Sequence, residues 1–267
     1  MSLPFRKLAL LLTAVLVLFG AAQAQERSLR VCSDPDNLPY SNQAGAGFEN
    51  KIAELIAQDL HATLEYDWWP QRRGFVRRTL GADMCDVLIG VPADFERVST
   101  TRPYYRSSYV FVTRADDAVP DFGSAAIRER RIGIQLIGND MAATPAGHAL
   151  TRAGATTKVT GFTIFGDGPA AQRMIAAIEA GTIDAALVWG PQAGYFAARA
   201  QAPLKVSIAR APAGTLEPFE FDVALGVKRG NKALLAELEG VLQRRQRDID
   251  TILAAWHVPR TDTGGRQ

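Results

Sequence analysis

The two cysteines and three histidines are the residues of this 267-residue chain best suited to redox or metal chemistry. The cysteines are Cys32 and Cys85, and the histidines are His61, His148 and His257. Two cysteines and three scattered histidines do not readily assemble a structural zinc site. In an oxidising compartment an isolated cysteine pair is more often a disulfide than a redox or metal centre. We therefore predict a Cys32–Cys85 disulfide and no metal site.

The motifs of nucleophilic and phosphate chemistry are missing from the sequence. No Ser-His-Asp or Ser-His-Glu set has recognisable local motif support, and the pattern G-x-S-x-G does not occur. Gly166 and Gly168 lack the lysine of a phosphate-binding loop, so we interpret them as a loop before a helix. We predict no catalytic residue, no cofactor and a protein that is not an enzyme.

A basic stretch follows two tryptophans at residues 68–78. Its arginines are Arg72, Arg73, Arg77 and Arg78. Two interpretations stay open: a surface that binds anions, or a solvated helix face whose charges point outward.

Aromatic residues are more often part of the core than of a binding site, although Trp and Tyr dominate binding hot spots where they line a cleft. Among the aromatics we predict Trp69 and Trp189 as binding residues and leave the others as packing.

The first 24 residues predict a secretory signal peptide. They contain Arg6 and Lys7, a run of apolar residues and a small-x-small site ending at Ala24. The apolar run is short of the roughly 20 residues that a membrane-spanning helix needs. Cleavage removes two of the 30 basic residues and leaves 28, against 28 acidic ones, and this neutral balance argues against nucleic-acid binding. We expect a periplasmic protein that begins at Gln25 and does not insert into a membrane.

Strand and helix patterns alternate along the rest of the chain, which predicts parallel sheets covered by helices. The first set has strands near residues 29–31, 64–66 and 87–91, with helices near 48–60 and 75–80. The second set has strands near 132–134, 185–189 and 204–208, with helices near 145, 174–178 and 191. In a lobe with strand order 2-1-3 the first and third strands are neighbours, which brings Cys32 and Cys85 within bonding distance.

Two extended apolar segments, near residues 109–113 and 219–227, connect the two sets. Two crossings between lobes form a hinge, with a cleft that can close on a ligand. We predict an α/β fold of two doubly wound lobes, and the polar break after Thr113 argues against the alternative of one doubly wound sheet. Lobe 1 would span residues 25–113 plus 223–267, and lobe 2 residues 114–222. The chain would end in two helices, near 234–242 and 249–253.

Several sequence blocks resemble the type II (family 3) extracellular solute-binding proteins. The blocks are residues 85–90, 95–98, 103–105 and 181–186. Longer blocks in the same order are similar to one subfamily, the quinoprotein-dehydrogenase-associated binding proteins, which are the J proteins of methanol oxidation systems. These are residues 32–42, 47–53, 68–77, 103–107 and 188–191. The resemblance implies the type II periplasmic binding protein fold, with a two-segment hinge.

The same resemblance implies a partner. It predicts a periplasmic accessory of a pyrroloquinoline-quinone methanol or alcohol dehydrogenase, which takes part in the assembly or activation of that enzyme. The dehydrogenase is the expected partner, with its cytochrome c as a second candidate. The alternative is a transporter-linked receptor for a small anionic solute. The third hypothesis is an enzyme with this fold, since a fold does not determine function.

The resemblance also assigns residues to the cleft. Arg97 matches an arginine that clamps the ligand carboxylate in amino-acid-binding relatives, although a salt bridge at the lobe surface is the alternative. Trp189 stands where a carboxylate would pair the ligand's ammonium, and a buried unpaired cation costs several kcal/mol. Arg73 stands near the position of a stacking aromatic. An ordinary amino acid is therefore a poor candidate, and the two arginines favour a polyanion, an acidic protein surface or no small ligand.

Overall fold

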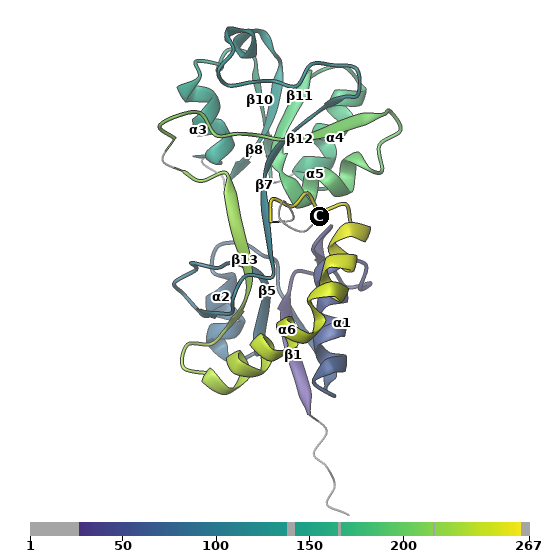
Figure 1. Ribbon diagram of the computed structural model, residues 1–267, viewed down its shortest axis with the longest axis vertical. Helices are drawn as coiled ribbons and strands as arrows, with labels where there is room; N and C mark the ends of the chain where they lie inside the picture. Colours follow the sequence, from purple (N-terminus) through teal and green to yellow (C-terminus); the bar gives the residue numbers. More distant parts are fainter. Residues whose placement is uncertain (1–26, 138–141, 165–166, 216, 263–267) are drawn as a thin grey trace, which may run out of the picture.

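The computed structural model describes residues 27–137, 142–164, 167–215 and 217–262. Figure 1 shows two groups of helices and strands, joined by β7 (Tyr105–Arg114) and β13 (Glu220–Val227). We call the lower group lobe 1 and the upper group lobe 2. Within the described ranges no helix is long and apolar enough to span a membrane. The predicted signal peptide lies outside the described residues.

Lobe 1 is built on three parallel strands. β5 (Val87–Pro92), β1 (Ser28–Ser33) and β4 (Thr63–Trp68) are hydrogen-bonded in that order. The apolar stripe predicted for α1 (Phe48–Asp59) lies in the core of this lobe, where Phe48, Ile52 and Ile56 are fully buried. Burying a side chain of this kind contributes about 1.5–3 kcal/mol. The stripe therefore holds α1 in place and sets where the residues of its first turn lie.

The disulfide between Cys32 and Cys85 is present, as predicted. The two Cα atoms are 5.4 Å apart, within the usual range for a bridge. Cys32 lies in β1 and Cys85 two residues before β5, and the pairing of Cys32 with Leu88 makes the two strands neighbours. Both cysteines belong to the apolar cluster that also contains Phe75 of α2 (Phe75–Arg78).

Lobe 2 has its own parallel strands. β10 (Val159–Thr163), β8 (Ile132–Ile137) and β11 (Ala185–Trp189) follow one another in the sheet, with β7 antiparallel to β11. β12 (Leu204–Ile208) is antiparallel to β7. The helices are α3 (Pro145–Arg152), α4 (Ala170–Glu179) and α5 (Gly190–Ala197). The shorter elements of both lobes are β2 (Asp36–Asn37), β3 (Ser41–Asn42), β6 (Ser99–Thr100), β9 (Ala142–Ala143) and the 3-10 turns Leu80–Ala82 and Ala125–Glu129.

The two extended segments expected from the sequence are β7 and β13. Residues 105–108 of β7 pair with residues 220–223 of β13, whereas residues 109–113 pair with β11 of lobe 2. The remainder of β13 pairs with β5 of lobe 1. The strands of both lobes therefore follow one another along a single hydrogen-bonded path through β7 and β13. The exact lobe boundaries drawn from the sequence stay a prediction.

The prediction of two C-terminal helices is wrong. One helix, α6 (Lys232–Ala255), covers both apolar stripes. The polar residues between the stripes do not break the helix, because they make contacts on its surface. Arg244 and Arg245 form ion pairs with Asp59 of α1, and Gln246 Nε2 donates to the Tyr104 carbonyl at 2.9 Å.

After α6 the chain runs between the lobes, below α5 (Figure 1). Ser107 Oγ donates to the Pro259 carbonyl at 2.5 Å, which holds this terminal segment against β7. On α5, a Cβ added to Gly194 would lie 1.8 Å from the His257 carbonyl oxygen. The terminal segment therefore packs directly against lobe 2, where only glycine leaves enough space.

Candidate functional site

A cavity of about 400 Å³ opens in lobe 1, between β1, β5 and the segment before α2. An apolar cluster holds these elements together; its members are Cys32, Phe75, Leu80, Cys85, Leu88, Val91 and Val98. Gly74 has a φ of 94° and turns the chain into α2, a conformation that suits a residue without Cβ. Phe75 is thereby buried, while Arg72 and Arg73 lie at the edge of the cavity.

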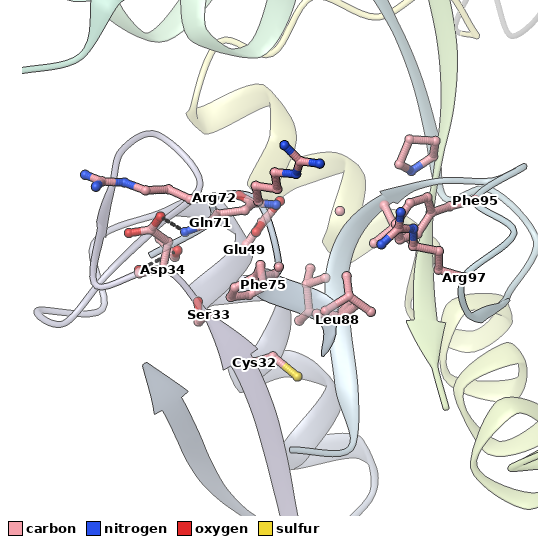
Figure 2. Close-up of a pocket in the computed structure, with 18 residues that line it drawn as sticks. Cys32, Ser33, Asp34, Glu49, Gln71, Arg72, Phe75, Leu88, Phe95 and Arg97 are labelled. Atoms are coloured by element: carbon pink, nitrogen blue, oxygen red, sulfur yellow. Dashed lines mark hydrogen bonds between the residues drawn. The ribbon is translucent and has the colours of Figure 1, made fainter. Parts of the chain in front are cut away.

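Arg73 and Arg97, two of the predicted binding residues, both line this first cavity. Figure 2 shows Arg97 across the cavity from Arg72 and Glu49. The side chains of Arg73 and Arg97 are exposed, and neither makes a hydrogen bond or an ion pair with any part of the chain that the structure describes. The salt-bridged alternative for Arg97 is therefore not what the structure has. Its role in binding stays a prediction.

A second cavity of about 610 Å³ lies between the lobes and contains the predicted binding residue Trp189. The two cavities share part of their lining: Asp34, Glu49, Gln71, Arg72, Gly90 and Pro92. Trp69 lines neither cavity. It is 40% exposed, and the Arg78 guanidinium lies 5.1 Å from its ring centroid. The structure thus brings Arg73 and Arg97 to one cavity, places Trp189 in the adjoining one and leaves Trp69 outside both.

Glu49, which the sequence did not single out as a site residue, lies on the wall shared by the two cavities. It sits in the first turn of α1, whose start is fixed by the Asn50 side chain accepting from the Gly47 N–H at 3.1 Å. A Cβ on Gly90, which has a φ of 81°, would lie 2.0 Å from Glu49 Oε1. The carboxyl group therefore occupies the space that any larger residue at position 90 would need.

The electrostatic state of Glu49 follows from its surroundings. Burial raises its pKa well above the usual 4.5, and the nearby Asp34 carboxylate adds to the shift. The helix dipole favours a negative charge in the first turn and works against part of this effect. No described residue donates a hydrogen bond to the Glu49 carboxyl or forms an ion pair with it. An acid in the first turn of a helix was the only sequence signal, and such acids are common at helix starts.

Asp34 is held in a fixed position beside Glu49. Its carboxylate accepts from the Gln71 N–H at 2.5 Å, visible in Figure 2, and from the Asp36 N–H at 2.9 Å. Asp34, Asp36 and Glu49 line the interlobe cavity together with one arginine, Arg72. The cationic cleft expected from the sequence is therefore confined to the first cavity, whereas three acids, one arginine and five aromatic residues are among those that line the second.

The aromatic side of the interlobe cavity is built around Trp189. Its ring lies 5.7 Å from that of Tyr109 and 5.5 Å from that of Phe221, both T-shaped contacts. Tyr40 is also in this group. Burial raises its pKa well above 10, and a hydrogen bond with Trp189 offsets only part of this rise. Burial likewise raises the pKa of Tyr109 to about 12. These phenols are therefore neutral hydroxyl groups at physiological pH.

Comparison with known proteins gives consistent matches. A family model for bacterial extracellular solute-binding proteins, family 3, matches residues 29–259. Protein MoxJ of Paracoccus denitrificans is 31% identical over 279 residues, which cover 97% of this chain and 98% of MoxJ. The crystal structure of periplasmic binding protein XoxJ from Methylobacterium extorquens AM1 matches with a TM-score of 0.73 at 33% identity, over 87% of this chain and 98% of XoxJ.

A further solved structure shares the fold. MxaJ from Methlophaga aminisulfidivorans MPT matches with a TM-score of 0.73 at 23% identity, over 87% of this chain and 100% of MxaJ. At that identity the likeness concerns the fold alone. Together the matches confirm the fold class predicted from the sequence, a type II periplasmic binding protein with α/β lobes.

Proposed function

The chain belongs to family 3 of the bacterial extracellular solute-binding proteins, and on that basis we propose a specific role for it. It is a periplasmic binding protein that serves a pyrroloquinoline-quinone methanol or alcohol dehydrogenase as an accessory. It takes part in the assembly or activation of that enzyme and has no catalytic activity of its own. The 31% identity to MoxJ over 97% of the chain is the observation that carries this proposal.

The location of the matching blocks supports the same role. The subfamily-like blocks at residues 32–42, 47–53 and 68–77 are distant in sequence but line the same two cavities. Residues that line a cleft serve binding more often than residues of the packed core do. The cleft is therefore the part of the surface that we assign to the dehydrogenase.

Arg73 and Arg97 are the residues proposed to meet the dehydrogenase. Both are exposed cations without a partner in the described structure, so they can pair with carboxylates of another protein at no cost in broken salt bridges. Trp69 and Trp189 are proposed as the aromatic contacts. The cytochrome c of the dehydrogenase is the second proposed partner, tested in the same way.

The test measures association of the purified protein with the dehydrogenase at several salt concentrations. Two exposed charge pairs contribute at most about 1 kcal/mol each, so Arg73→Ala with Arg97→Ala weakens binding by up to about thirtyfold at low salt. Arg229→Ala is the matched control, since Arg229 is exposed and lines neither cavity. If the double variant binds like wild type with the same salt dependence, the contact lies elsewhere.

The second candidate is a transporter-linked receptor for a small anionic solute. The observation that favours it is the arginine-lined cavity of about 400 Å³, which is within the size range of ligand pockets. Calorimetric titration with a panel of mono- and dicarboxylates distinguishes the two roles. Micromolar binding of a carboxylate that depends on Arg97 supports the receptor, and a periplasmic pull-down that recovers a dehydrogenase supports the accessory.

A further inference from the structure

The terminal segment, residues 256–262, leaves α6 in a direction that the end of the helix fixes. His257 has a φ of 55°, the left-handed conformation that often follows the last turn of a helix. The Val258 N–H donates back to the Leu253 carbonyl at 3.0 Å, which closes this turn. The segment therefore starts from lobe 1 and enters the space between the lobes (Figure 1).

Lobe 1 holds the segment at three points. Val258 is buried in the main apolar core of this lobe. The Trp256 Nε1–H donates to the Ala46 carbonyl at 3.3 Å, and the Arg260 guanidinium forms an ion pair with Asp250 of α6 at 2.7 Å. Because the Arg260 side chain is only 12% exposed, salt and water screen this pair less than a pair at the surface.

The two strands that join the lobes are also bonded to the segment. The Thr261 N–H donates to the Arg106 carbonyl of β7 at 3.1 Å, and the Thr261 hydroxyl donates to the Glu220 carboxylate of β13 at 3.3 Å. The buried Ser107 hydroxyl donates to the Pro259 carbonyl at 2.5 Å. These bonds lie where β7 and β13 pair with each other. The segment is thus fixed to both strands at the crossing between the lobes.

Lobe 2 meets the segment at α5. A Cβ added to Gly194 would lie 1.8 Å from the His257 carbonyl oxygen. A Cβ added to Gly190, one turn earlier, would lie 2.7 Å from Ser107 Oγ. Trp256 packs against the apolar core clusters of both lobes. The two glycines therefore allow α5 to lie in direct contact with the segment and with β7.

A hinge movement of the lobes would have to disrupt this packing. When two lobes open or close, residues at the crossing change their backbone angles while each lobe moves as a body. Rotation of lobe 2 towards the segment is blocked at Gly190 and Gly194, since no space remains there. Rotation in the opposite sense separates α5 from the segment, or draws the segment off the strands and breaks the bonds of Ser107 and Thr261.

We propose that the terminal segment is a strap that holds the two lobes in one relative orientation, so that the interlobe cavity keeps its width when no ligand is bound. The two-strand hinge expected from the sequence is therefore locked in the folded protein. This inference goes beyond the proposed function and does not depend on it, because every contact that it uses lies within this chain. A locked cleft presents a preformed surface to a protein partner, whereas a receptor that encloses its solute needs lobes that move.

The experiment measures the distance between the lobes by pulsed electron paramagnetic resonance. One nitroxide label is attached to each lobe through Ala82→Cys and Ala176→Cys, at two exposed positions. Cys32 and Cys85 form the disulfide, so neither native cysteine competes for the label. With no ligand added, the otherwise wild-type protein should give a single narrow distance distribution.

Two substitutions release the strap in the full-length chain. Ser107→Ala removes the hydrogen bond to the Pro259 carbonyl, and Gly194→Ala displaces the His257 carbonyl. Together they should widen the distance distribution by about twofold or more, or add a second distance. Ser108→Ala is the matched control, because Ser108 is the adjacent buried serine of β7 and its hydroxyl has no hydrogen-bond partner among the described residues. This control should leave the distribution unchanged.

A second pair of substitutions keeps the test open if the first variant fails to fold. Ser107→Ala with Arg260→Ala frees the segment from β7 and from Asp250 of α6, and it should widen the distribution in the same way. Two results overturn the proposal. One is a wild-type protein that gives a broad or multiple distance distribution without ligand. The other is a folded strap variant whose distribution is as narrow as that of the wild type.

Discussion

Removal of the Cys32–Cys85 disulfide should destabilise the protein by about 4 kcal/mol. The bridge closes a loop with a sequence separation of 53 residues, which contains α1, β4 and α2. In the chain-entropy description, a loop of this length adds about 4 kcal/mol by restricting the unfolded chain. For a protein of this size each kcal/mol shifts Tm by about 2–4 °C, so Tm should fall by about 8–16 °C.

The assay compares thermal and urea unfolding of the oxidised protein, the same protein reduced with a phosphine, and the variant Cys32→Ala with Cys85→Ala. Both cysteines are buried, 4% and 2% exposed, so the alanine variant also loses packed sulfur atoms. The reduced wild type keeps both sulfurs and therefore isolates the effect of the cross-link. The reductant should leave the alanine variant unchanged.

Two results would refute this reasoning. Titration of two reactive thiols in the native, unreduced protein would show that the bridge is not formed. Equal unfolding midpoints for the oxidised and reduced protein would show that the unfolded chain is not restricted by it. A loss much larger than about 4 kcal/mol would mean that the bridge also holds the lobe 1 cavity together in the folded state.

Three further predictions concern the terminal segment, the buried acid and export. Gly194→Ala should cost about 1–3 kcal/mol in urea unfolding, because its Cβ would meet the His257 carbonyl at 1.8 Å, whereas Gly240→Ala in α6 should not destabilise. Glu49→Gln should unfold at a higher temperature than wild type at about pH 8 and at the same temperature near pH 4. The reason is that the pKa of Glu49 is raised in the folded protein, so the wild type loses stability as the pH rises from about 4.5 towards that pKa, whereas glutamine does not ionise. Sequencing of the exported protein should begin at Gln25, and an intact first residue would contradict the signal peptide.

Much of the architecture could be predicted from local sequence patterns. Apolar residues spaced by three and four positions predicted α1, and continuous apolar runs predicted β5 and β11, because burial on one face or on both leaves that periodicity in the sequence. The disulfide could also be predicted, since the two cysteines belong to strands that are neighbours in a lobe of order 2-1-3, which makes the bonding distance reachable. The error at α6 has the opposite origin: a polar stretch resembles a loop unless its ion-pair partner, Asp59, is known.

The composition of the cleft was decided by the tertiary structure. Asp34, Glu49, Tyr109 and Trp189 are far apart in the chain, and no local pattern shows that they line one cavity. The raised pKa of Glu49 arises from burial and from Asp34, which are properties of the folded environment and not of residue type. Local sequence therefore specified the helices, the strands and the candidate arginines Arg73 and Arg97. The long-range packing of the two lobes decided which charges and aromatic rings line the same cavity.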